Sequence, residues 1–221
     1  MSGLPLWWYD GCPAEIRTRK SVETATKRCF DVATALLLAM LFSPSVLVIA
    51  ILVRLTSPGP ILFSQWRIGK DGTFFRVHKF RTFHSAACDE TGRSQTVSDD
   101  ERVTSFGRFL RVTSLDEIPQ LLNVLRGEMS IVGPRPHVPG MLAGGMLYDE
   151  LVPYYHLRHA VRPGITGWAQ ANGLRGPSAD PHSARERVNH DIAYIQNVSL
   201  RLDIKIIWMT LFRQVLPGRG L

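Results

Sequence analysis

The longest apolar segment of the chain runs from Val32 to Val53, 22 residues without a charged side chain. As one helix it would be about 33 Å long at 1.5 Å per residue, enough to cross the hydrocarbon core of a bilayer. Ser43-Pro44 lies in the middle, where proline removes a backbone donor and bends a helix. Basic residues flank both ends, Lys27 and Arg28 before and Arg54 after. Because positive residues favour the cytoplasmic side, both ends are expected on one face, as in a re-entrant hairpin. An ordinary kinked transmembrane helix is the alternative.

The next segment alternates between apolar and polar positions and contains one turn. Ile61–Ile68 and Thr73–Phe80 flank Gly69–Gly72, which predicts a β-hairpin. Lys79 and Arg81 stand on either side of Phe80 and therefore project to the face opposite it. The two residues are either a phosphate-binding pair or a solvated strand face, and the pattern leaves both interpretations open.

The rest of the chain is mostly helical in pattern. It predicts an α/β fold that is rich in helix, with the hairpin and short strands. The organisation is expected to be a tail over 1–26, a membrane segment over 27–56 and a catalytic domain over 57–221. The expected elements are a loop and candidate lid at His84–Arg102, a short helix or turn at Val103–Val112, a helix from Leu115, a strand at Met129–Val132, helices at Tyr148–Ala160 and Arg185–Asn197, and a last helix at Leu200–Leu216 that is either interfacial or part of the core.

Charge and composition narrow the class of partner. The 221 residues carry a formal net charge of +7, so anionic partners such as phosphates or lipid headgroups are expected. No helix-turn-helix, zinc-finger or RNP pattern is present, so nucleic acid is not an expected partner. The three cysteines are far apart and form no C-x-x-C, which is typical of a reducing compartment without disulfides.

Two adjacent carboxylates, Asp116 and Glu117, precede an apolar helical pattern. Ser114-x-x-Glu117 fits a capping box, a purely structural role that leaves Asp116 unexplained. Nearby positive charge would keep Asp116 ionised, and such a carboxylate can attack phosphorus. A second carboxylate beside it suits Mg²⁺, a cation that takes oxygen ligands and bridges to phosphates. The surrounding basic residues are Arg108, Arg111, Arg126 and Arg135.

Prolines enclose one of these arginines, in Gly133-Pro134-Arg135-Pro136. They restrict the backbone and reduce the entropy lost when Arg135 is presented to a ligand. A rigidly held arginine suits bidentate contact with phosphate oxygens. A proline-rich turn with a solvated arginine is the alternative.

Several motifs together resemble the bacterial sugar transferases, the monotopic phosphoglycosyl transferases that start glycoconjugate assembly on a polyprenyl phosphate. The resemblance covers about residues 27–216 and corresponds to the minimal form of the family. The motifs that carry it are Lys27-Arg28 with Phe30-Asp31, the apolar segment with Ser43-Pro44, Lys79-Phe80-Arg81-Thr82, Thr113 to Leu121 with Asp116-Glu117, Gly133-Pro134-Arg135-Pro136, and Arg162-Pro163-Gly164-Ile165-Thr166-Gly167.

The resemblance implies a reaction and a set of roles. Asp116 is the nucleophile that attacks the β-phosphate of a UDP-sugar with loss of UMP, and a polyprenyl phosphate, undecaprenyl phosphate above all, then takes the phosphosugar. Asp116 and Glu117 hold Mg²⁺, and Lys79, Arg111 and Arg135 contact substrate phosphates.

The resemblance also implies a place in the cell. The apolar segment is a re-entrant helix broken at Ser43-Pro44, in the bacterial inner membrane, with interfacial amphipathic helices and the catalytic domain on the cytoplasmic face. Homo-oligomerisation is left open. Two other functions remain: a glycosyltransferase that releases UDP, and a non-catalytic membrane-docked scaffold.

Overall fold

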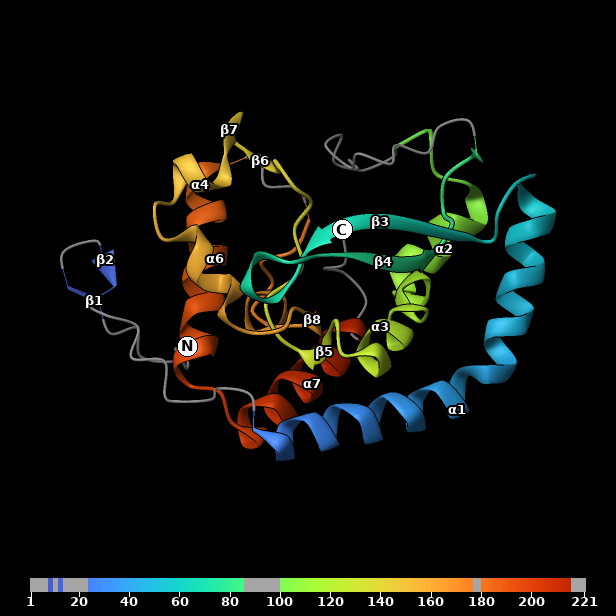
Figure 1. The fold of residues 1–221 in the computed structure, drawn as a ribbon. Helices are drawn as coiled ribbons and strands as arrows, with labels where there is room; N and C mark the ends of the chain where they lie inside the picture. Colours follow the sequence, from blue (N-terminus) through green and yellow to red (C-terminus); the bar gives the residue numbers. More distant parts are fainter. Residues whose placement is uncertain (1–7, 10–11, 14–23, 86–99, 177–179, 216–221) are drawn as a thin grey trace.

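The computed structural model describes residues 8–9, 12–13, 24–85, 100–176 and 180–215. It confirms a mixed fold of helices and short strands (Figure 1). Four two-stranded sheets are present in the described ranges. The elements are β1 (Trp8–Tyr9), β2 (Cys12–Pro13), α1 (Ala25–Thr56), β3 (Leu62–Ile68), η1 (Lys70–Gly72), β4 (Phe74–Phe80), α2 (Ser105–Thr113), η3 (Leu115–Glu117), α3 (Gln120–Arg126), β5 (Ser130–Val132), β6 (Leu142–Ala143), β7 (Met146–Leu147), α4 (Tyr148–Leu151), η4 (Tyr155–Ala160), β8 (Gly164–Thr166), α5 (Trp168–Ala171), α6 (Pro181–Gln196) and α7 (Leu200–Val215).

The apolar segment forms a single bent helix, α1, with Pro44 inside it. Figure 1 shows its ribbon turning sharply about half-way, so that the two halves run in different directions. Pro44 has no N–H for the carbonyl of Met40 four residues earlier. The hydroxyl of Ser43 donates to that carbonyl instead, at 2.8 Å. The Ser43-Pro44 pair therefore bends the helix without leaving this carbonyl unsatisfied.

The outward side of α1 is apolar and uncovered. Leu37, Met40 and Leu41 are 66%, 72% and 66% exposed, which is unusual for large apolar side chains. In the part of the chain that the structure describes, α1 is the one helix long and apolar enough to cross a membrane.

The first turns of α1 are fixed to the rest of the molecule by buried charges. The ammonium of Lys27 lies 2.8 Å from the carboxylate of Asp203 on α7 and also donates to the carbonyl of Val132 on β5. Asp31 accepts from the hydroxyl of Ser130 and the backbone N–H of Ile131, at 2.8 and 3.1 Å. Buried charges need such partners, so these contacts fix where α1 begins.

The other end of α1 is held by Arg81, which follows β4. Its guanidinium donates to the carbonyl of Pro58 at 2.8 Å and to that of Ser57, and the residue is 3% exposed. The last carbonyls of a helix lack intrahelical donors, and Arg81 supplies donors just beyond this end. The prediction that Arg81 and Lys79 form a phosphate-binding pair is therefore not supported, and Arg81 is not a solvated strand residue either.

The predicted hairpin is confirmed as β3 and β4, with Leu62 opposite Phe80 and Ile68 opposite Phe74. The side-chain amide of Asn123 on α3 covers part of the outer edge of β4. It accepts from the N–H of His78 and donates to the carbonyl of Arg76. Pairing these groups protects a strand edge that would otherwise be open. The hairpin is thereby attached to the helix that follows the two carboxylates.

A short parallel pair, β5 and β8, forms the centre of the main core. The predicted strand at Met129–Val132 is confirmed as β5, and Val132 lies opposite Thr166 of β8. Two glycines allow the backbones to meet next to this pair. An added Cβ at Gly133 would collide with the carbonyl of Arg162, and one at Gly164 with the backbone of Gly133.

Two predicted helices have different bounds. Tyr148–Ala160 is not one helix, because Pro153 separates α4 from the 3₁₀ helix η4. Val152, before this proline, is extended, as steric contact with the proline ring favours. The helix expected at Arg185 begins at Pro181 instead, with Asp180 as its N-cap. The helices expected at Val103–Val112 and from Leu200 are confirmed as α2 and α7.

Some expectations fall on residues outside the described ranges. These are most of the tail over 1–26, most of the candidate lid (86–99), one of the three cysteines, Cys88, and the end of the chain after residue 215. At the base of the candidate lid, Phe83 forms a bridge with Val103.

Removing the Lys27 charge should destabilise the protein strongly. The Lys27→Met variant leaves Asp203 as a buried carboxylate without its cation, which costs about 3–5 kcal/mol. Thermal unfolding in detergent should show a clear fall in the unfolding temperature. The matched Arg54→Met variant removes an exposed charge from the same helix and should unfold like wild type. Equal unfolding temperatures for Lys27→Met and wild type would contradict the structural role of this pair.

Candidate active site

The two adjacent carboxylates lie in η3, a 3₁₀ turn between α2 and α3. Ser114 before it has a left-handed backbone with φ of 57° and ends α2. Its side chain makes no capping hydrogen bond to η3, and Glu117 binds two cations instead. The predicted capping box is therefore wrong, and the helix after the carboxylates begins at Gln120 rather than Leu115.

Glu117 is the centre of a partly buried three-residue ion-pair network. Its Oε1 atom accepts from Lys79 Nζ and from an Arg135 guanidinium nitrogen, each at 2.7 Å. Burial alone would raise the pKa of Glu117, but the charges of Arg135 and Lys79 outweigh burial and hold the pKa well below its usual range. Glu117 is therefore ionised and fixed in position.

Asp116 has a different environment from its neighbour. Lys79 is the one cation within ion-pair distance of it among the described residues, at 3.8 Å. Burial raises the pKa of Asp116, the Lys79 charge opposes this, and the negative charge of Glu117 adds to the rise. Asp116 is thus a buried carboxyl with less compensation than Glu117, an environment that is common for functional carboxyls.

Arg111 approaches from α2 on another side of Asp116. Its Nε donates to the hydroxyl of Thr82 at 2.8 Å, and its guanidinium stacks over Phe83 with 4.4 Å to the ring centre. The charge of Arg111 lowers the pKa of Asp116, so the two are electrostatically linked without a direct ion pair. The contacts with Thr82 and Phe83 hold this cation in place without the help of a carboxylate.

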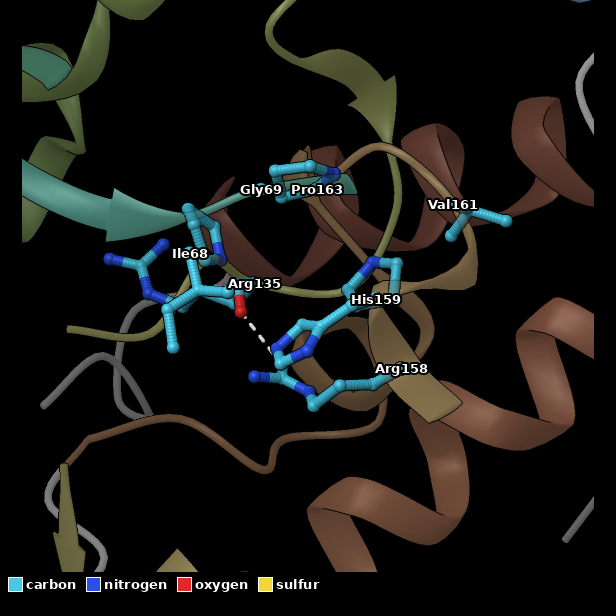
Figure 2. Close-up of a pocket in the computed structure, with 9 residues that line it drawn as sticks. Ile68, Gly69, Arg135, Arg158, His159, Val161 and Pro163 are labelled. Atoms are coloured by element: carbon cyan, nitrogen blue, oxygen red, sulfur yellow. Dashed lines mark hydrogen bonds between the residues drawn. The ribbon is translucent and has the colours of Figure 1, made fainter. Parts of the chain in front are cut away.

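The Gly133–Pro136 loop carries Arg135. Three successive carbonyls of this loop accept hydrogen bonds from other parts of the chain. Pro134 accepts from the N–H of Gly164 at 2.9 Å, and the carbonyl of Arg135 accepts from Arg158 at 2.7 Å. Pro136 accepts from Arg67 at 3.1 Å. Figure 2 shows the hydrogen bond from Arg158 to the Arg135 carbonyl among the residues that line a cavity of about 10 Å³, room for one water at most. This small cavity is part of the loop support and not a substrate site.

Arg158 is held in turn by a buried carboxylate on α6. Its guanidinium donates twice to Asp191, at 3.1 and 2.7 Å, and both side chains are at most 2% exposed. The pair is a rigid support behind the loop, because neither residue can move without exposing a buried charge.

Arg67 of β3 is a site residue that the sequence analysis did not identify. Its guanidinium reaches the loop at Pro136, and its charge attracts Glu117. Hairpin register could have indicated it, since Arg67 and Lys79 lie on the same face of the ribbon. Two arginines expected nearby lie elsewhere: Arg126 contacts His78, and Arg108 is exposed on α2.

The two carboxylates suit a magnesium ion that takes its remaining ligands from the substrate. No group of three metal-ligating side chains occurs in the described ranges, so a fully protein-built cage is not seen there. Mg²⁺ commonly binds one or two carboxylates together with substrate phosphates and waters. The less compensated Asp116 and the second oxygen of Glu117 fit that requirement.

The arrangement as a whole is suited to phosphoryl chemistry. A reactive carboxyl faces cations from the hairpin, from α2 and from the proline loop. Cations fixed before the reaction stabilise charge as it develops on transferring phosphoryl groups.

Comparison with known proteins gives consistent similarities. A family model described as bacterial sugar transferase matches residues 22–217. The exopolysaccharide production protein PSS of Rhizobium leguminosarum bv. phaseoli is 49% identical over 90% of this chain and all of the relative. A UDP-glucose:undecaprenyl-phosphate glucose-1-phosphate transferase of Escherichia coli (strain K12) is 44% identical over 96% of this chain. A UDP-N-acetylgalactosamine-undecaprenyl-phosphate N-acetylgalactosaminephosphotransferase of Aeromonas hydrophila is 41% identical over 88%. The chain spans 44% of the length of each of these last two relatives.

Variants of the Arg158–Asp191 pair can separate its effect on protein stability from its effect on the position of Arg135. Arg158→Met should cost about 3–5 kcal/mol, because Asp191 is left buried and unpaired. The double variant Arg158→Met/Asp191→Leu should recover much of that stability, since an apolar pair replaces a buried ion pair. Its turnover should stay at least about tenfold low, because the Arg135 carbonyl has lost its donor.

The measurements are thermal unfolding and turnover with saturating substrates, with Arg201→Met on the exposed side of α7 as the control. A double variant with normal turnover would show that the pair does not position Arg135.

Proposed function

The chain belongs to the bacterial sugar transferase family, a family of transferase enzymes, and on this basis we propose that it transfers a sugar-1-phosphate from a UDP-sugar to a polyprenyl phosphate. The acceptor is undecaprenyl phosphate, as in the names of the enzymes from Escherichia coli and Aeromonas hydrophila. These two relatives are named for different sugars, so the proposal extends to the UDP-sugar class. The product would begin a lipid-linked glycan for exopolysaccharide synthesis.

The observation that carries the proposal is the unequal environment of the two carboxylates. Glu117 is neutralised by Lys79 and Arg135, whereas Asp116 is buried with a raised pKa and a single cation at 3.8 Å. A carboxylate that is desolvated but weakly paired is the better nucleophile, because less stabilisation is lost when it forms a bond.

In the first step, an Asp116 carboxylate oxygen attacks the β-phosphorus of the UDP-sugar. The bond from that phosphorus to the oxygen of the α-phosphate breaks, and UMP departs with the bonding electrons. The phosphosugar stays on Asp116 as an acyl phosphate ester. Lys79, Arg111 and Arg135 neutralise the charge that accumulates on the phosphoryl oxygens. Mg²⁺ held by Asp116 and Glu117 would supply further positive charge to the phosphates.

In the second step, an oxygen of the polyprenyl phosphate attacks the same phosphorus. The bond from phosphorus to Asp116 breaks, the carboxylate is regenerated, and the sugar is left on a lipid diphosphate. No proton transfer is needed at the attacking atoms, because both nucleophiles are anions. Fixed cations are therefore the main requirement of both steps.

A re-entrant topology for α1 is supported by the way both of its ends are held. Lys27 bonds to Asp203 at one end, and Arg81 bonds to the carbonyls of Ser57 and Pro58 at the other. A straight helix of 32 residues would separate its ends by about 48 Å. The bend at Pro44 instead lets both ends contact one catalytic body. We place that body on the cytoplasmic face of the bacterial inner membrane, with the exposed apolar residues of α1 and α7 in the lipid.

Asp116→Asn should abolish turnover, with a fall of about a thousandfold or more, because the nucleophile is lost. The assay is release of UMP from UDP-glucose and UDP-N-acetylgalactosamine with undecaprenyl phosphate and Mg²⁺. Chelation of Mg²⁺ should also stop the reaction. The control Asp149→Asn alters an exposed carboxylate on α4 and should behave like wild type. Mass spectrometry of wild type quenched with donor alone should find the phosphosugar on Asp116.

Three results would contradict this function. Release of UDP instead of UMP would indicate a glycosyltransferase that moves only the sugar. Normal turnover by Asp116→Asn would remove the proposed nucleophile. A folded wild type that is inactive with every UDP-sugar would favour a non-catalytic role.

The topology is tested by cysteine labelling from outside the cell. After the native cysteines are replaced by serine, Ala25→Cys and Pro60→Cys introduce exposed thiols beside the two ends of α1. A membrane-impermeant maleimide should label neither site in intact spheroplasts and both sites after permeabilisation. Labelling of one site alone from outside would refute the re-entrant arrangement and favour a spanning helix.

A further inference from the structure

Arg67 lies on the face of the hairpin that looks toward the two carboxylates. It shares this face with Lys79 and with the buried residues Phe75 and Val77. Its guanidinium donates to the carbonyl of Pro136 at 3.1 Å and to the side chain of Gln65. The hairpin and the proline loop therefore fix the direction of this arginine before any ligand binds.

Arg67 is a half-buried cation near a second cation, Arg135, in the loop to which it donates. Burial lowers the pKa of its guanidinium to about 10, and the positive charge of Arg135 adds to this effect. Among the described residues, no carboxylate lies within ion-pair distance of Arg67, and Glu117 is already shared by Lys79 and Arg135. Placing like charges together costs free energy, which a bound anion would recover.

The charge of the site exceeds what its own carboxylates neutralise. Four cations, Lys79, Arg67, Arg111 and Arg135, surround two carboxylates, Asp116 and Glu117. Before any bound Mg²⁺ is counted, the side chains carry an excess of two positive charges, the sign of charge that attracts the diphosphate of a nucleotide sugar. The Asp100–Arg102 ion pair beside Arg111 is neutral as a unit and does not alter this balance.

The order of the cations around Asp116 separates the two phosphates of the donor. Lys79 lies 3.8 Å from Asp116, whereas Arg135 bonds to the neighbouring Glu117. Arg67 bonds to the carbonyl of Pro136, the residue that follows Arg135 in the proline loop. The phosphorus that is attacked must lie next to Asp116, so it falls beside Lys79. The phosphate that leaves must lie farther from Asp116, toward the loop that carries Arg135 and accepts from Arg67.

We propose that Arg67 and Arg135 clamp the departing phosphate of the nucleotide donor, the phosphate that becomes UMP. The inference rests on the proposed function and adds a residue and a phosphate-binding role to it. Arg67 would neutralise the negative charge that this phosphate gains when the bond to the attacked phosphorus breaks. The same contact would contribute to the affinity of the enzyme for UMP.

Two other roles for Arg67 must be separated from this one. The arginine could serve only to hold the loop through the Pro136 carbonyl. Its charge could also serve the phosphate of the lipid acceptor rather than that of the nucleotide. Both roles involve the same guanidinium, so the test uses ligands that carry only one phosphate each.

The experiment measures equilibrium binding of UMP and of farnesyl phosphate to the full chain in detergent with Mg²⁺. The variants are Arg67→Gln, which removes the charge but can still donate to Pro136, and Arg67→Lys, which keeps the charge without the planar fork. The control Arg76→Gln removes an arginine from the opposite face of the same hairpin, where it stacks on Trp66. We expect Arg67→Gln to weaken UMP binding about tenfold or more, and Arg67→Lys to lie between it and wild type. Farnesyl phosphate should bind within about twofold of wild type in every variant, as should UMP to Arg76→Gln.

Ligand-free stability provides the second measurement. Arg67→Gln relieves the repulsion from Arg135, so its unfolding temperature should equal or exceed that of wild type. A marked fall for both Arg67 variants, with UMP affinity unchanged in Arg67→Lys, would indicate that Arg67 only holds the loop and would overturn the proposal.

The remaining outcomes also decide. Equal UMP affinity of wild type and Arg67→Gln, whether both are high or both are too low to measure, overturns the clamp. A loss of farnesyl phosphate binding alone in Arg67→Gln also overturns it and would assign Arg67 to the acceptor. A loss of UMP affinity in Arg76→Gln equal to that in Arg67→Gln overturns it as well.

Failure of the broader function is distinguishable, because it is measured by UMP release from a UDP-sugar. If wild type releases UMP while Arg67→Gln binds it normally, only the clamp fails. If UMP binding depends on Arg67 but no UDP-sugar is turned over, the phosphate site stands and the transferase proposal fails.

Discussion

The Glu117 carboxylate is the point at which three separate parts of the chain meet. Lys79 arrives from the hairpin and Arg135 from the proline loop, and both donate to one oxygen of Glu117 at 2.7 Å. Losing either contact would leave Glu117 with one of its two cations, so both pairs favour a single arrangement of the hairpin, η3 and the loop. Both of these cations bond to Glu117, and Asp116 lies 3.8 Å from Lys79. The unequal pairing of two neighbouring carboxylates therefore follows from which of them completes the fold.

A similar constraint governs the long apolar helix α1. The body of the protein bonds to both ends of α1 through charged side chains, Lys27 and Asp31 at the start and Arg81 just beyond the end. Apolar packing alone could not specify this, because a uniformly apolar helix can rotate and slide with little change in buried area. Charged contacts have defined partners and so fix the position of the helix. Pro44 then provides the bend that is compatible with both attachments.

The local patterns of the sequence were reliable where neighbouring residues decide the structure. Alternation and the Gly69–Gly72 turn predicted the hairpin correctly, because side-chain period and turn chemistry act over a few residues. Predictions that needed distant partners were less successful. Glu117 had the spacing of a capping box, but Lys79 and Arg135 compete for its carboxylate more strongly than a backbone N–H does. Arg81 resembled a phosphate ligand, yet the nearby end of α1 offers carbonyls that nothing in the sequence pattern could place beside it.

The proline loop shows how the position of one arginine can depend on residues from several other elements. Prolines on both sides of Arg135 remove two backbone donors, so the loop cannot fold through hydrogen bonds of its own. Its carbonyls instead accept from Gly164, Arg158 and Arg67, which come from β8, η4 and β3. Each donor is fixed by its own element, and together they leave Arg135 little freedom. Arg67 differs from the other two because it also brings an uncompensated positive charge to the site. Anything that binds this charge acts on the donor that holds Pro136, so ligand binding and the position of the loop are mechanically coupled.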